Sequence, residues 1–490
     1  MAIAEQNRNE YVSAQPQTQS ARWALASLSL ATLLSSLGTS IASVGLPSLM
    51  QNFGATFQAV QWVVLAYLLA ITTLIVSAGR LADMFGRRPL LLAGIALFTS
   101  ASVLCGLAPT LWLLIAARAV QGLGAALMMA LTLAFVAETV TKDRIGSAMG
   151  LLGAMSAIGT TLGPSLGGLL IAGFGWRAIF LVNVPLGVLT FALAWRALPA
   201  HSKTAQQVDR GTFDVVGTAL LALTLAAYAL AMTLGRGNFG ALNIGLLIAA
   251  GIGVFLFAAA QARVKNPLIQ LASFRDLQLS ASLTMSLVVA TVMMATLVVA
   301  PFYLSRGLGL DAAMVGLVLS TGPLVSTLSA LVAGRLADRF GAHRMMVAGL
   351  LSLATGTFLL SLAVIRFGIA GYVVAITVTC IGYALFQTSN NAAVMTGVGA
   401  GQRGVVSGLL NLSRNLGLIT GASLMGAIFA VASAKGQEGI GLLSSEAAAR
   451  GMQVTFQTAT VLALAALFLA LLSARAEFKR QRLVEVSQDL

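Results

Sequence analysis

Charged side chains are scarce in this sequence, and their scarcity excludes a water-facing fold of this length. Only 9% of the 490 residues are Asp, Glu, Lys or Arg, whereas 58% are hydrophobic. A soluble protein carries about 25% charged residues, because its surface must face water. The solvent around most of this chain is therefore expected to be lipid.

Cysteine and histidine are also rare. Cys105 and Cys380 fall in separate apolar runs, and their spacing fits neither a disulfide framework nor a zinc motif. His201 and His343 both fall in predicted loops. We therefore expect no metal site and no cofactor. An enzyme is disfavoured too, because catalysis would need clustered nucleophiles, bases or metal ligands at membrane depth.

Carboxylates are missing from the middle of every apolar run. All fifteen lie in a loop, in a tail or near the end of a run, as Glu138, Asp214 and Asp311 do. A buried carboxylate is the usual group that attracts a cation or carries a proton across a membrane. Its absence disfavours dicationic substrates and favours neutral or anionic amphiphiles. If protons are coupled, the candidate carriers are rim groups such as Asp83, Glu138, Asp311 and Asp338.

Long apolar runs are what the sequence has in abundance. A helix needs about 20 apolar residues to cross a bilayer, and fourteen runs reach that length. We predict spanning helices at residues 23–45, 58–78, 89–107, 111–136, 146–173, 177–197, 214–234, 242–262, 279–304, 313–333, 345–365, 369–397, 403–432 and 452–474. The first run exceeds the core of a secretory signal, so it is expected to be a retained helix.

Most lysines and arginines lie in segments that share one side of the membrane with the N-terminal tail. By the positive-inside rule, both termini are expected in the cytoplasm and the chain in the inner membrane. The net charge of +14 then reflects topology, so we expect no nucleic-acid partner.

An internal repeat is visible in two motifs. The segment from Gly79 to Gly86 returns from Gly334 to Gly341, 255 residues later, and Gly159 and Gly163 return as Gly417 and Gly421, 258 residues later. Six spans fill about 180–200 residues, so the offset leaves room for two more. The predicted domains are a tail at 1–22, a six-helix bundle at 23–200, a two-helix insert at 201–278, a six-helix bundle at 279–474 and a tail at 475–490.

The motif Gly79-x-Leu-Ala-Asp83-x-x-Gly86-Arg87-Arg88 resembles the loop-2/3 signature of the major facilitator superfamily. The motif Gly159-x-x-x-Gly163-Pro164-x-x-Gly167-Gly168 resembles the antiporter signature of drug exporters, and Arg118-Ala-Val-Gln121-Gly122 extends the likeness along the chain. The motifs Trp62-x-x-x-x-Tyr67 and Trp176-Arg-x-x-Phe-x-x-Asn183-x-Pro185-x-Gly187 resemble those of the fourteen-helix drug:proton antiporter branch. The resemblance implies an all-α integral membrane protein of the major facilitator fold. It also implies multidrug efflux by alternating access, with the proton as coupling ion, membrane lipids around it and a monomeric state.

The loop motifs predict gates between the two bundles. Asp83 should meet the start of the thirteenth helix near Arg403, and Asp338 should meet the start of the fifth helix near Arg144. Gly159, Gly163 and Gly167 share one helix face that allows close packing, and Pro164 is expected to bend it. The predicted gating residues are Gly79, Asp83, Gly86, Arg87, Arg88, Gly334, Asp338, Gly341, Arg144, Arg403, Gly159, Gly163, Pro164 and Gly167.

Arg118 is the most telling charge, because an arginine at mid-helix must face protein or a wet cavity. With Gln121 it should give donors to a substrate, to a water chain or to helix-one carbonyls, unless it is a structural clamp. Polar and aromatic residues of other helices complete the predicted substrate site. Its members are Arg118, Gln121, Tyr67, Trp62, Gln387, Asn390, Asn391, Asn411, Arg414, Asn415, Phe302, Tyr303 and Phe386.

One departure from the family pattern matters for the substrate. Where many fourteen-helix exporters of cationic drugs carry an Asp in the first helix, this chain has Gly38. Export of small neutral or anionic molecules is thus the leading interpretation. Symport of an organic anion and flipping of a lipid-like substrate remain alternatives. An ATP-driven pump is disfavoured because the Gly-x-x-x-x-Gly-Lys-Ser/Thr loop is missing, and no ring of charges supports a channel.

Overall fold

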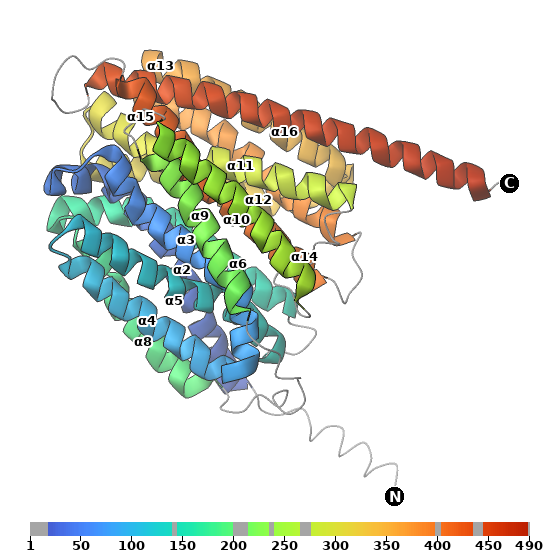
Figure 1. Cartoon of the computed structure of the whole chain (residues 1–490), viewed down its shortest axis with the longest axis horizontal. Coiled ribbons are helices and arrows are strands. Elements are labelled where there is room, and N and C mark those ends of the chain that lie inside the picture. The colour runs from blue at the N-terminus through green and yellow to red at the C-terminus, as the bar shows by residue number, and fades with distance from the viewer. Residues whose placement is uncertain are drawn as a thin grey trace, which may run out of the picture.

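Among the residues that the structure describes, fourteen helical segments are long and apolar enough to cross a membrane, as the sequence predicted. The structure is a computed structural model (Figure 1). It describes residues 18–139, 145–198, 214–234, 240–264, 276–396, 403–434 and 444–488. All regular elements in these ranges are helical.

Six spans come before the middle of the chain, and we call them the first bundle. They consist of α2 (Thr18–Phe53), α3 (Phe57–Phe85), α4 (Arg87–Leu107), α5 (Leu111–Thr139), α6 (Ile145–Phe174) and the broken pair α7 (Ala178–Leu181) and α8 (Asn183–Ala197). The middle pair is α9 (Val215–Thr233) and α10 (Ala241–Arg263).

Six further spans form the last bundle. They consist of α11 (Leu277–Phe302) with η3 (Tyr303–Gly307), α12 (Ala312–Phe340), α13 (Ala342–Thr396), α14 (Arg403–Thr420) with η4 (Gly421–Met425) and α15 (Gly426–Ala434), and α16 (Ser445–Gln488). We call the membrane side on which the first span begins and the last span ends the terminal side. The opposite side, where α2 ends and α3 begins, is the far side.

Several helices extend beyond their predicted bounds: α2, predicted at 23–45, runs from Thr18 to Phe53, and α12, predicted at 313–333, runs from Ala312 to Phe340. The eleventh and twelfth spans are joined in one element, α13, whose chain turns at Gly368 with φ 54°. This glycine lies in the gap predicted between 365 and 369, and a glycine with positive φ reverses the chain at no steric cost. The last helix also begins earlier and ends later than predicted, because α16 runs from Ser445 to Gln488.

Carboxylates near the helix ends act as N-caps. Asp214, Asp276 and Asp311 each accept a backbone N–H at the start of α9, α11 and α12, at 2.7, 2.9 and 2.8 Å respectively. A cap satisfies a donor that has no partner within the helix. This accounts for acids at the ends of apolar runs rather than inside them.

The repeat seen in the sequence is also a repeat of packing. A Cβ on Gly124 of α5 would collide with the Gly94 carbonyl and the Phe98 backbone of α4. A Cβ on Gly382 would collide in the same way with the Gly349 carbonyl and the Leu353 backbone. Each bundle therefore joins its third and fourth spans backbone to backbone at matching positions, which is how small residues hold helices together in lipid.

The two bundles converge on the far side and separate towards the terminal side. One apolar core contains far-side residues of both bundles, such as Leu49 of α2, Phe57 of α3 and Phe302 of α11. Near the terminal side, the core around Leu28 and Leu91 contains only first-bundle residues. In Figure 1 the two sets of helices correspondingly splay apart towards the marked termini.

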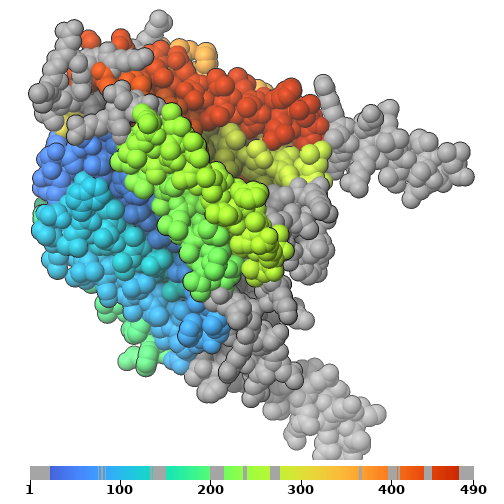
Figure 2. Space-filling model, viewed as in Figure 1, coloured from blue at the N-terminus to red at the C-terminus, as the bar shows by residue number. Residues whose placement is uncertain are grey.

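The middle pair lies across the face where the bundles meet (Figure 2). Helix α9 is tied to α3 by a hydrogen bond between Ser77 and Thr218, 2.9 Å, and by another from the Trp62 indole to Thr233, 3.1 Å. Tyr228 of α9 faces Thr420 and the η4 turn of the last bundle. The inserted helices therefore contact both bundles.

Candidate functional site

Arg118 is fully buried and lies at the centre of a polar cluster within the first bundle. Its Nε donates to the Val63 carbonyl of α3 at 2.8 Å, and its Nη1 donates to Gln121 Oε1 at 2.6 Å. Gln121 in turn donates to Ser102 Oγ of α4 at 2.7 Å. The cluster therefore links α3, α4 and α5.

Aromatic rings cover the same guanidinium. Arg118 Cζ lies 4.1 Å from the ring centroid of Tyr67, a cation–π distance, and 5.8 Å from that of Phe180. The sequence offered helix-one carbonyls as partners for Arg118, but Tyr67 is the residue that donates to one, the Ser35 carbonyl at 2.9 Å. Arg118 Nη2 is buried without a hydrogen-bond partner. The binding of a substrate by Arg118 therefore remains a prediction.

The corresponding place in the last bundle is apolar. An offset of 258 relates Arg118 to Ile376 and Gln121 to Thr379. Thr379 donates to the Ala375 carbonyl of its own helix at 2.8 Å, and Ile376 packs near Gly322. The cationic cluster is thus a property of the first bundle alone.

Of the predicted aromatic residues, Phe302 lies where the two bundles meet. Its ring centroid is 4.6 Å from that of Phe57 and 6.2 Å from that of Phe429. Tyr303 and Phe386 are buried within the last bundle. Trp62 is turned towards α9 by its bond to Thr233. These four residues are therefore not gathered into one site in this conformation.

The polar candidates of the last bundle lie on α13 and α14. Gln387 donates to Asn391 Oδ1 at 3.3 Å on an exposed face, whereas Asn390 is buried and donates to the Ser282 carbonyl at 3.4 Å. On α14, Asn415 is buried, and Arg414 and Asn411 are half-buried. Asn411 is engaged with a partner.

Three groups of contacts close the far side between the bundles. Phe57 packs against Phe302 and also against Phe429, at 5.1 Å. Gln61 donates to the Ala422 carbonyl in η4 at 2.8 Å and is 1% exposed. With its amide oxygen turned to the guanidinium, Gln51 accepts from Arg306 Nη1 at 3.2 Å.

Sequence reasoning did not select Phe57, Gln61, Arg306 or Phe429 for this closure. The available signals in the sequence were that Gln61 directly precedes Trp62 of the family-like motif and that Arg306 directly follows an apolar run. Neither signal shows which helix of the other bundle will lie opposite.

The glycine face predicted on α6 packs against α2. A Cβ on Gly159 would collide with the Leu33 carbonyl, and one on Gly163 would collide with Ser40. Gly167 lies against Ile41. Pro164 lies within α6, and its carbonyl faces Gly316 of α12. The same helix therefore packs against its own bundle and against the other one.

The predicted terminal-side gates lie mostly outside what the structure describes. The side chains of Asp83, Arg144 and Arg403 and the surroundings of Gly79 are among the parts not described, and Asp338 is exposed. The turns themselves are described, because Gly86 and Gly341 have φ of 87° and 90° and cap α3 and α12 alike. Both ion pairs therefore remain predictions, as does any gating role for Gly334 and for Arg87, which is engaged with a partner.

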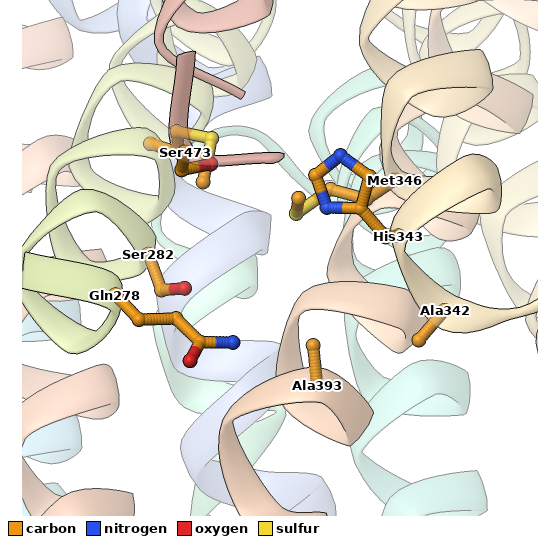
Figure 3. Close-up of a pocket in the computed structure, with 8 residues that line it drawn as sticks. Gln278, Ser282, Ala342, His343, Met346, Ala393 and Ser473 are labelled. Carbon is orange, nitrogen blue, oxygen red and sulfur yellow. The ribbon is translucent and has the colours of Figure 1, made fainter. Parts of the chain in front are cut away.

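His343 does not lie in a loop, as the sequence suggested, but in the first turn of α13. It lines a cavity of about 190 Å³ at the terminal side of the last bundle (Figure 3). Gln278 and Ser282 of α11 lie on the opposite wall, and His343 Nε2 has no hydrogen-bond partner. Among the described residues, no group of three His, Cys, Asp or Glu side chains could hold a metal ion.

Comparisons with known proteins agree with this geometry. The sequence profile of the Major Facilitator Superfamily matches residues 28–422 and, in a second match, 281–487. Multidrug resistance protein Stp of Mycobacterium tuberculosis is 33% identical over 402 residues, covering 80% of this chain and 72% of Stp. Riboflavin transporter RibZ of Clostridioides difficile is 29% identical over 403 residues, covering 82% of this chain and 86% of RibZ.

Solved structures show the same fold at much lower identity. A bacterial homologue of the human lysosomal transporter Spinster, in an inward-facing and unoccupied conformation, superposes with a TM-score of 0.70 at 15% identity. The similarity covers 94% of this chain and 98% of that structure.

Proposed function

Because this chain belongs to the Major Facilitator Superfamily, a family of transporters, we propose that it exports small amphiphilic molecules by alternating access. The observation that carries the proposal is the shared apolar core. Among the described residues, the first-bundle members of that core lie in the far-side half of the bundle, and the core of its terminal-side half contains residues of the first bundle alone. A path between the bundles would therefore open on the terminal side. In our proposal the terminal side is the cytoplasm, the membrane is the inner membrane, and this conformation receives the substrate.

Neutral or anionic substrates are favoured by the charges of the spans. The described carboxylates Asp214, Asp276 and Asp311 cap helices, Asp338 is exposed near the end of α12, and Glu446 lies in the first turn of α16. Arg118 and Arg414, by contrast, lie within spans. An unpaired acid is what a cation would need. The names of Stp and RibZ, a multidrug resistance protein and a riboflavin transporter, are compatible with this substrate class.

The driving force is proposed to be the proton gradient, with the protein acting as a monomer. One elementary charge that moves across 100 mV releases about 2.3 kcal/mol, which supports an accumulation of tens-fold. The proton carrier is sought among rim groups, because the described spans offer no carboxylate at mid-membrane.

Transport into inside-out vesicles tests the direction and the charge preference together. Riboflavin as a neutral probe, fluorescein as an anion and ethidium as a cation would be compared in vesicles with and without the protein. We expect accumulation of the neutral or anionic probe that collapses with an uncoupler. Uptake of the anion into whole cells, with none into inside-out vesicles, would instead establish the alternative hypothesis, symport of an organic anion.

Lipid flipping is the second alternative, and the vesicle assay separates it as well. A flippase would move a fluorescent phospholipid between leaflets without accumulating water-soluble probes. Arg118→Lys serves as the matched variant, because it keeps the charge but removes the planar fork that bonds Val63 and Gln121. Slower transport in Arg118→Lys at unchanged protein level would support a role for this guanidinium in the cycle.

A further inference from the structure

The outer face of α8 carries a shallow, largely open recess at its terminal-side end, which we call the hollow. It measures about 320 Å³, and the described residues that line it are Phe191, Ala192, Trp195 and Arg196. These positions lie at i, i+1, i+4 and i+5, so they share one face of the helix. Trp195 is 58% exposed, and its ring stacks on that of Phe191 with centroids 6.0 Å apart. The described part of the hollow is thus an exposed aromatic surface with one cation beside it.

Arg88 of α4 fixes the tryptophan and alters the charge of this helix end. Its Nη2 donates to the Trp195 carbonyl, and its Cζ lies 5.7 Å from the centroid of the Trp195 ring. The last carbonyls of a helix carry a partial negative charge that would repel an anion. A guanidinium bonded there neutralises that charge. Arg196, exposed in the last turn of α8, is then left to act on an external group.

We propose that this hollow binds the headgroup of an anionic phospholipid. The phosphodiester would bond Arg196, since a guanidinium matches phosphate geometry with two parallel donors. The glycerol region would pack on Phe191 and Trp195, because aromatic rings favour the membrane interface. The acyl chains would follow the exposed Val188 and Leu189 of the same helix, which are 58% and 49% exposed.

A lipid suits the site better than a soluble anion, because the exposed Trp195 lies near the end of a helix that is long and apolar enough to span a membrane. The last bundle offers no equivalent. Position 343, which corresponds to Arg88 by the offset of 255, is His343, and α16 continues past Ser473 instead of ending. The site therefore belongs to one bundle. It does not depend on which substrate is transported.

Quenching of Trp195 fluorescence by brominated lipids tests the proposal on the full chain in vesicles. Dibromo-phosphatidylglycerol would be compared with dibromo-phosphatidylcholine, and the Trp195 signal would be isolated as the difference between the native protein and Trp195→Phe. One cation near the surface contributes about 1 kcal/mol towards anionic lipid, so we expect about fivefold preferential quenching by the anionic lipid.

Two matched controls make the result specific. Trp112, 74% exposed at the far-side start of α5, should show no lipid preference when isolated in the same way. Arg196→Gln should abolish the preference at Trp195. Arg263→Gln, which removes an exposed arginine from the last turn of α10, should leave it intact.

Three results would overturn the proposal. Equal quenching of Trp195 by both lipids would show an ordinary interfacial anchor. An unchanged preference in Arg196→Gln would show that this guanidinium does not hold the headgroup. Release of the preference by millimolar inorganic phosphate would show a site for free phosphate. None of these results depends on transport, so the proposed export could fail while this site stands.

Discussion

The two bundles meet at two helix–helix interfaces on the far side, α6 against α12 and α15 against α3, which we call the two lines. Residues that correspond in the repeat make different contacts in these two interfaces. On one line, Gly168 of α6 packs so closely on α12 that a Cβ would collide with the Ala312 carbonyl and with Gly316. On the other, the nearest atoms that a Cβ on Gly426 of α15 would meet all belong to the Gln61 side chain. The repeat offsets relate Gly168 to Gly426 and Gly316 to Gln61.

The difference indicates how each line can open. In the first line the backbones of the two helices are in contact, so it separates only if whole helices move apart. In the second line the contact is made by the Gln61 side chain, whose hydrogen bond to the Ala422 carbonyl breaks with a change of rotamer. Helix α9 extends the second line through Trp62 and Thr233. We infer that the middle pair supports the weaker line.

A second contrast lies inside the bundles. Arg118 donates hydrogen bonds to Val63 and Gln121, whereas the matching position in the last bundle is the buried, apolar Ile376. The same helix packing therefore carries a charge in one bundle and none in the other.

The largest effect on stability should come from placing in the last bundle the arginine that the first bundle has at the corresponding position. Ile376→Arg would bury a guanidinium without the acceptors that surround Arg118, at a cost of about 3–5 kcal/mol. We expect aggregation on size-exclusion chromatography in detergent, whereas Ile376→Met should elute as the native protein does. A monodisperse Ile376→Arg would show that the last bundle tolerates the charge and would remove the contrast.

Side chains added to the backbone line should have the next largest effect. Gly168→Val or Gly316→Val forces overpacking, which costs about 1–3 kcal/mol, and should lower the thermal unfolding midpoint and abolish transport. Gly426→Ala should be milder, and Gln61→Ala in the same chain should rescue it. If Gln61→Ala rescued Gly168→Val equally well, the two lines would not be distinct.

Removing only the hydrogen bond that the Gln61 side-chain amide donates to α14–η4 should have a smaller effect on stability. Gln61→Leu removes the donor to the Ala422 carbonyl, with an expected loss of about 0.5–1.5 kcal/mol. It should shift the protein away from the far-side-closed state. Labelling of a Cys introduced at Val315, which is buried in the core shared by the two bundles, would report that shift as faster reaction. An unchanged rate would mean that Gln61 does not hold the line closed.

The smallest effect is expected at the middle pair. Thr233→Val removes the acceptor of the Trp62 indole while preserving shape, and should cost about 1 kcal/mol. Thr224→Val, a buried threonine of the same helix whose Oγ1 has no partner, is the matched control and should cost less. A larger loss in Thr224→Val would show that the bond to Trp62 contributes little.

The number of spans could be predicted from the sequence, because the length of an apolar run is set by membrane thickness. The turn at Gly368 could be predicted as well, because it lies in the gap predicted between 365 and 369. The π-helical turns η3 and η4 could not be predicted, because there the helical hydrogen bonding shifts by one residue. Such shifts depend on local packing and leave no compositional signal.

Within the candidate site, burial of Arg118 at the interior of protein followed from the cost of a charge in lipid. The carbonyl that accepts its hydrogen bond could not be predicted, because a long side chain reaches several carbonyls and only the packed structure selects that of Val63. The far-side closure was missed for a similar reason. Phe57 and Phe429 are ordinary aromatic residues until the two bundles place them in contact.

Distances between spin labels on the two bundles test alternating access most directly. One pair would join Asn52 of α2 to Met314 of α12 on the far side, and the other would join Met84 of α3 to Phe340 of α12 on the terminal side; all four side chains are exposed. In Gly168→Ala, where the added Cβ weakens far-side closure, we predict a longer far-side distance together with a shorter terminal-side distance. If both distances lengthened, or only one changed, the bundles would not rock about a path between them and the account would be wrong.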